Sequence, residues 1–207
     1  MLKAVREYLS FAGVQYRNPD KAGDEREKML DLRQKGQEAR KSFTELAKTF
    51  QASHPEWKLQ QTSQWMNQAQ RLRPHFWAYL QRDGQVAEPM LALRLYGEGS
   101  DFGISLEVSF IERKKDEQTL DKQVKVLELP AVEEIYYLVY SNGESHKMEA
   151  NEENRRTLRE KLRNQEVRKV LVKSDVSFIE NQSVEAILEE LEDAYTRLLP
   201  YYEVTRE

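Results

Sequence analysis

Residues 104–110 read Ile-Ser-Leu-Glu-Val-Ser-Phe, and this stretch decides the fold. Apolar side chains alternate strictly with polar ones, which is the period of a β-strand that buries one of its faces. Ile104 and Phe110 end the apolar series, whereas Glu107 lies at the centre of the polar series. A strand of this kind with one polar face is typical of an antiparallel sheet, so we expect neighbouring strands with the same period.

The residues before this strand predict two such neighbours. Residues 76–81 alternate in the same way, residues 90–96 form a leucine-rich run, and turn residues lie at 83–84 and 97–103. Residues 76–110 therefore predict a three-stranded antiparallel meander. On its second face we expect Trp77, Tyr79 and Glu107, with Arg94 on the middle strand close to them. Such a set would suit a polar ligand, and it would equally suit a covered face with a buried ion pair.

The rest of the chain predicts helices at both ends and a second hairpin. Asn142-Gly143 is the strongest hairpin signal, Gly36 weakens the first long helix, Ser183 is the N-cap of the last helix and Pro200 is its end. The expected helices are 24–50, a short one at 62–70, 116–128, 152–164 and 183–199, and the expected later strands are 135–140, 145–149 and 170–172.

Regular alternation of strands and helices is absent, so the order of elements indicates an α+β fold. We expect a mainly antiparallel sheet of about five to six strands, made of the meander and the hairpin and covered by the N-terminal and C-terminal helices. Residues 1–207 are expected to form a single α+β domain, in which 1–52 is a helical segment and 53–207 holds the sheet with flanking helices.

The composition fits a protein of a reducing compartment and excludes thiol chemistry. The chain has no cysteine, a formal net charge of −4 and 33% charged residues. A protein that coats DNA is usually strongly basic, and no run reaches the length of a membrane span. Charged residues at the N-terminus do not fit a signal peptide. We therefore expect a cytoplasmic protein with no membrane contact.

No catalytic motif is present. The glycines of residues 97–103 precede a strand, so they predict a hairpin loop and no phosphate-binding loop. The nucleophile motif Gly-x-Ser-x-Gly is absent, and His54, His75 and His146 are too far apart in the sequence to indicate a metal site. We expect no cofactor and no metal and lean towards a non-enzymatic protein. The alternative is a metal-dependent phosphoester or phosphodiester hydrolase that uses carboxylates such as Asp101 and Glu112.

The segment 57–82 has the most unusual composition, because it combines all three tryptophans with several basic residues. Such residues dominate protein-binding hot spots and can stack on nucleic-acid bases. The competing interpretation is that the tryptophans pack the long helix onto the sheet. We predict a binding or interaction module, with a protein partner or a homodimer favoured over nucleic acid. Its candidate residues are Trp65, Arg71, Arg73, His75, Trp77, Tyr79, Arg94 and Glu107.

Charges are also unevenly distributed near the C-terminus. Residues 155–173 carry eight basic and two acidic residues, and residues 175–196 carry seven acidic residues and no basic one. We expect the acidic helix to neutralise the basic segment within the molecule, in preference to nucleic-acid binding.

The stretch 76–113, together with Leu198-Leu199-Pro200-Tyr201-Tyr202, resembles a small family of uncharacterised bacterial proteins. Some members of that family carry a glucose-6-phosphate 1-dehydrogenase label. The residues give that label no support, because no Gly-x-Gly-x-x-Gly motif opens a helix in this chain. The resemblance therefore implies a bacterial protein, and it implies no catalytic residue and no cofactor.

Overall fold

The computed structural model describes residues 2–82, 88–98, 101–110, 117–178 and 182–206. Its helices are α1 (Leu2–Leu9), α2 (Arg26–Ala52), α3 (Glu117–Val124), α4 (Glu152–Arg163) and α5 (Val184–Arg206), with short 3-10 turns at Pro19–Lys21, Gly23–Glu25 and Lys125–Leu127. Its strands are β1 (Lys58–Leu59), β2 (Trp77–Gln81), β3 (Met90–Glu98), β4 (Asp101–Ser109), β5 (Tyr136–Ser141), β6 (Glu144–Glu149) and β7 (Lys169–Ser177).

The strands form one antiparallel sheet in the order β1-β2-β3-β4-β7-β5-β6. This confirms the α+β class, the meander β2–β3–β4 and the hairpin β5–β6, whose turn residues Asn142 and Gly143 both have positive φ. The described residues contain seven strands, slightly more than the five to six expected. The short strand expected at 170–172 extends over nine residues, and it pairs with both β4 and β5.

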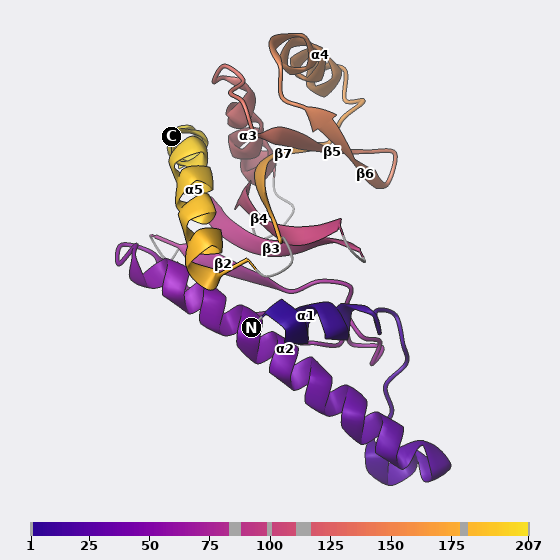
Figure 1. Cartoon of the computed structure of the whole chain (residues 1–207). Helices are drawn as coiled ribbons and strands as arrows, with labels where there is room; N and C mark the ends of the chain where they lie inside the picture. Colours follow the sequence, from indigo (N-terminus) through magenta and orange to yellow (C-terminus); the bar gives the residue numbers. More distant parts are fainter. Residues whose placement is uncertain (1, 83–87, 99–100, 111–116, 179–181, 207) are drawn as a thin grey trace.

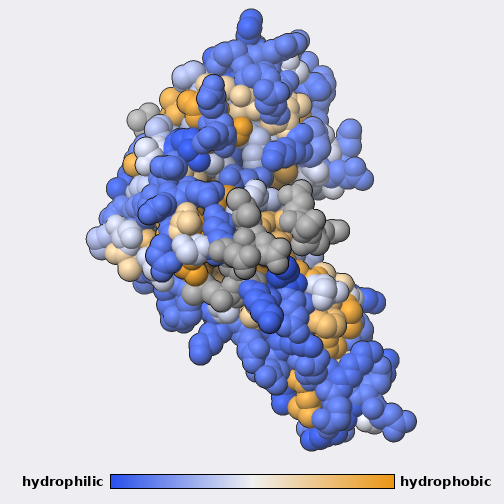
Figure 2. Space-filling model, viewed as in Figure 1, coloured by the Kyte–Doolittle hydropathy of each residue, from blue (hydrophilic) through white to orange (hydrophobic). Residues whose placement is uncertain are grey.

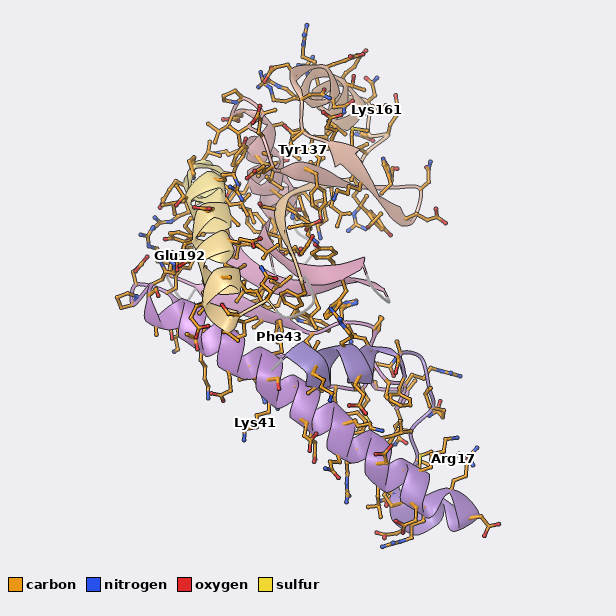
Figure 3. The ribbon with its side chains drawn as sticks, viewed as in Figure 1. Arg17, Lys41, Phe43, Tyr137, Lys161 and Glu192 are labelled. Atoms are coloured by element: carbon orange, nitrogen blue, oxygen red, sulfur yellow. The ribbon has the colours of Figure 1, made fainter. Side chains whose placement is uncertain are left out.

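Helices α1, α2 and α5 cover the apolar face of the sheet (Figure 1). Helix α5 lies on β4 and β7, while α2 packs on α1, β2 and α5. Phe43 points from α2 towards the sheet, where its ring is 5.9 Å from that of Phe76, whereas Lys41 points away (Figure 3). These contacts create a continuous hydrophobic core between the helices and one face of the sheet.

Helix α5 begins as predicted but does not end at Pro200. The Ser183 hydroxyl accepts a hydrogen bond of 3.0 Å from the amide of Ala186, so the predicted N-cap is confirmed. The predicted end is wrong, because the helix continues to Arg206 with Pro200 inside it. Tyr201 and Tyr202 in the following turn are buried in the core, and their burial outweighs the disruption by proline.

The helix predicted at 62–70 does not form. Met66 and Leu72 form an isolated antiparallel bridge, and Gln70 has a φ of 58°. The indole of Trp65 fills the space above Gly36 of α2, where a Cβ atom would lie 2.6 Å from the ring. Gly36 therefore serves close packing, and α2 runs through it without interruption.

The visible surface is mostly hydrophilic, with small apolar areas (Figure 2). Two residues of the basic segment have acidic partners outside residues 175–196. Arg155 pairs with Glu152 of its own helix at 2.7 Å, and Lys173 pairs with Glu107 at 3.1 Å. Helix α4 lies at the far end of the sheet from the N-terminal half of α5 (Figure 1).

Candidate functional site

The second face of the sheet, opposite the covering helices, carries a row of polar side chains. Because residues in register on neighbouring strands point to the same side, the pairs Tyr79–Ala92, Ala92–Glu107, Glu107–Lys173 and Lys173–Tyr136 place these side chains on one face. The pairing of Trp77 with Arg94 adds a second row. The predicted set of Trp77, Tyr79, Arg94 and Glu107 therefore does share one face.

At the centre of this face lies a buried ion triad, formed by Arg94, Glu107 and Lys173. The Nε and Nη2 atoms of Arg94 donate to Oε1 of Glu107 over 3.2 and 3.1 Å, and Nζ of Lys173 lies 3.1 Å from Oε2. The side chain of Glu107 is 1% exposed, that of Lys173 5% and that of Arg94 24%. Two cations thus share one fully desolvated carboxylate, which leaves the triad with a net positive charge.

The triad holds Glu107 and Arg94 in their ionised forms. Burial alone would raise the pKa of the Glu107 carboxyl, but the charges of Arg94 and Lys173 outweigh it and keep that pKa below its usual range. Burial likewise opposes the charge of Arg94, yet the attraction of Glu107 raises the pKa of the guanidinium. Removing Glu107 would leave two cations without their counter-charge in a dry environment.

Aromatic rings lie next to the triad. The indole of Trp77 lies between two guanidinium groups, 4.7 Å from Arg73 and 5.3 Å from Arg94, which are cation–π distances. The His75 ring is 5.6 Å from Trp77. Burial, together with the positive charges of Arg94, Arg73 and Lys173, lowers the pKa of His75 to about 4. The imidazole is therefore neutral at pH 7.

A cavity of about 480 Å³, which we call the sheet-face cavity, opens on this face. Its lining joins Tyr79, Arg94 and Glu107 from the meander to residues of β5, β6, β7 and α3. Arg168 and Lys169 supply two further positive charges at the start of β7. Small-molecule sites in proteins typically measure 300–1,000 Å³, so the volume suits a small ligand.

One buried donor in the lining is left without a partner. Gln123 of α3 is 2% exposed, and its Nε2 makes no hydrogen bond to any residue that the structure describes. The Oε2 atom of Glu107, in contrast, is satisfied by the Lys173 ammonium 3.1 Å away. Buried polar groups are nearly always satisfied in folded proteins, and the amide of Gln123 is a group that an acceptor on a bound molecule would satisfy.

The structure divides the predicted site residues into two groups. Arg73, His75, Trp77, Tyr79, Arg94 and Glu107 lie at or beside the sheet-face cavity.

Trp65 and Arg71 lie elsewhere. Trp65 is 7% exposed, and its ring packs edge-on against Tyr16 at 5.0 Å. Arg71 is exposed and donates to the carbonyl of Gly13 over 3.1 Å. Trp57 is buried as well, so the aromatic segment 57–82 is in large part core and does not form one continuous surface.

Sequence reasoning missed Lys173, Arg168, Lys169 and Gln123 as site residues. The alternation Lys169-x-Leu171-x-Lys173 on β7 could have placed both lysines on one face, but nothing in the sequence indicates that β7 pairs with β4. Gln123 reads as an ordinary polar residue of a charged helix. Only the tertiary structure shows that its amide lacks a hydrogen-bond partner among the described residues.

The carboxylates predicted for the hydrolase alternative belong to Asp101 and Glu112. Glu112 lies outside the described residues, and so does the side chain of Asp101. Within the described part of the chain, no group of three or more His, Asp or Glu residues could hold a metal ion.

The chain matches no protein-family model, and no curated protein is significantly similar to it. None of the helices within the described ranges combines the length and the apolar character needed to cross a membrane.

Proposed function

We propose that this protein is a binding protein that takes a small anionic ligand into the sheet-face cavity. One observation carries the proposal. The described lining holds Arg94, Arg168 and Lys169 against the single carboxylate of Glu107, a formal charge of +2 while His75 is neutral. A protein of net charge −4 concentrates positive charge at a concave, partly buried surface, and such a surface attracts anions.

The three cations differ in what they can offer a ligand. Arg94 already donates to Glu107, so its guanidinium keeps the remaining N–H groups and a fixed orientation. Arg168 is exposed and makes no ion pair with another described residue. It is therefore free to meet an incoming anion, and Lys169 next to it adds a second charge. The binding-module interpretation thus moves from the tryptophan segment to this cavity.

The experiment is a thermal-unfolding titration with inorganic phosphate and a set of small carboxylates. We expect a saturable rise in melting temperature for at least one anion, because a ligand that binds only the folded state stabilises it. The double variant R168Q/K169Q should lose this rise. The matched control R159Q/R163Q removes the same charge from exposed positions of α4 and should keep it. Equal responses from both double variants would refute a localised anion site.

The metal-dependent hydrolase remains the alternative. Saturable stabilisation by Mg²⁺ or Mn²⁺ that is lost in D101N or E112Q would favour it over the binding protein. A cytoplasmic location, a bacterial origin, and a protein partner or a homodimer remain predictions, and light scattering tests the homodimer directly.

A further inference from the structure

The sheet-face cavity has two polar ends, separated by an apolar floor. Along β7, Lys173 of the ion triad is followed on the same face by Leu171 and then by Lys169. The first and last of these lie four residues apart, which is about 13 Å along a strand. On β5 the facing residues repeat the order, with Leu138 paired to Leu171 and Tyr140 paired to Lys169. A ligand that fills the cavity must therefore be elongated, with an apolar middle.

The exposed end suits a phosphate group. Arg168 and Lys169 lie there together with the hydroxyl-bearing residues Tyr140 and Ser145. A carboxylate is satisfied by one bidentate arginine, whereas a phosphate carries up to two charges and three strong acceptor oxygens. Two cations and two hydroxyl groups at one end therefore suit a phosphate better than a carboxylate.

The middle of the cavity suits a flat ring. Leu138 and Leu171 are cross-strand neighbours, so their side chains form one apolar floor, and Phe110 and Leu120 complete the apolar lining. The unpartnered Nε2 of Gln123 belongs to the same lining. A buried donor of this kind needs a neutral acceptor, such as a ring carbonyl or a ring nitrogen. Every nucleobase combines a flat ring with such an acceptor at its edge.

We propose that the ligand is a nucleoside monophosphate, an inference that rests on the proposed function. Its phosphate lies between Arg168 and Lys169, its base lies on the floor of Leu138 and Leu171, and an acceptor of the base receives the free N–H of Gln123. At ~30 Å³ for each water molecule, the 480 Å³ of the cavity hold about sixteen waters. A covalently bonded ligand packs more densely, so about twenty non-hydrogen atoms fit.

The test is calorimetric titration of the full-length protein with the four ribonucleoside 5′-monophosphates, the matching nucleosides and ribose 5-phosphate. We expect at least one nucleotide to bind about tenfold more tightly than ribose 5-phosphate, since a hydrogen bond to a buried unpaired donor has about that effect on affinity. The nucleoside without phosphate should bind about 100-fold more weakly than its nucleotide, because two charge-assisted contacts are lost.

The variant Q123M separates a binding role from a structural one. It keeps the length of the side chain and removes the donor, so the advantage of the nucleotide over ribose 5-phosphate should disappear. Because Nε2 has no partner among the described residues of the free protein, the melting temperature of Q123M should be equal to that of the wild type or higher. A lower melting temperature with unchanged nucleotide affinity would overturn the role of Gln123.

The two proposals fail in different ways. If ribose 5-phosphate and the nucleotides bind equally and R168Q/K169Q abolishes both, the anion site stands and the nucleotide inference is overturned. If none of these anions binds, or if R168Q/K169Q binds them as the wild type does, both proposals are overturned. The comparison of ribose 5-phosphate with the nucleotides uses only the wild-type protein, so it does not depend on the folding of any variant.

Discussion

Replacing Glu107 with glutamine should destabilise the protein far more than the loss of one surface charge. The substitution keeps the shape of the side chain and one acceptor for Arg94. It removes the charge that balances two cations, of which Lys173 is almost fully buried. An uncompensated buried charge is among the few single changes that cost several kcal/mol.

The magnitude follows from the distances. Two unit charges 3.1 Å apart attract by about 5 kcal/mol at an effective dielectric constant near 20. Desolvation of the three ions offsets much of the total, at several kcal/mol per ion. Breaking a buried pair from one side typically costs 3–5 kcal/mol. Glutamine still accepts from Arg94, so we expect E107Q to lower the free energy of unfolding by about 3 kcal/mol.

The partner variant K173M gives the sharper test, because it leaves Arg94 and Glu107 as a balanced pair. Alone it should cost about 1–2 kcal/mol. Added to E107Q it removes a charge that has lost its partner, so the double variant should be more stable than E107Q by about 1 kcal/mol. The assay is urea unfolding followed by circular dichroism at pH 7. The control E45Q breaks the exposed pair with Lys48 and should change stability by less than ~1 kcal/mol. Additive losses in the double variant would refute the reasoning.

Three other changes test the packing and the electrostatics. Gly36→Ala should lower the free energy of unfolding by about 1–3 kcal/mol despite its better helix propensity, because the new Cβ would lie 2.6 Å from the Trp65 ring; a raised urea midpoint would contradict this. The folded pKa of His75, about 4, lies below the unfolded value near 6.5. The unfolded chain therefore binds more protons between these pH values, so the free energy of unfolding should fall as the pH drops from 6.5 to 4. This fall should be about 1–3 kcal/mol larger in the wild type than in H75Q. Parallel pH profiles of the two proteins would contradict the lowered pKa of His75. Pro200 is an exposed residue inside α5. Pro200→Ala should restore an amide donor, raise the free energy of unfolding by about 1–2 kcal/mol and so raise the melting temperature. A lower melting temperature would show that the proline stabilises the helix.

The sequence predicts the parts of this fold that depend on local pattern. Period-two alternation identifies the meander, Asn142-Gly143 identifies the hairpin, and Ser183 identifies the start of α5. Each of these signals acts over a few residues, so it can be read without knowledge of the tertiary structure. The wrong predictions concern residues whose conformation is set by distant partners. Trp65 is held by Gly36 of α2, and Pro200 is tolerated because the turn beyond it is buried.

The candidate site is only half predictable for the same reason. Alternation within the meander places Arg94 and Glu107 on one face, next to Trp77 and Tyr79. The rest of the site depends on β7 lying between β4 and β5, a pairing across more than sixty residues of chain. That insertion brings Lys173 to Glu107 and Lys169 to the rim of the cavity. No local pattern encodes it, and so the cationic character of the face could not be derived from the sequence.

The second face also gives a physical reason to treat this cavity as more than a packing defect. A sheet face covered for stability alone would be more stable with apolar residues in place of a buried ion triad. Here the triad lies beside a buried amide, that of Gln123, with no partner among the described residues. The triad leaves a net positive charge on this face and the amide lacks an acceptor, and a bound polar anion would supply both the balancing charge and the acceptor. If this account is right, substitutions that lower ligand affinity at Gln123 should leave the free protein as stable or more stable. A purely structural role for Gln123 would show the opposite, with stability falling when its amide is removed.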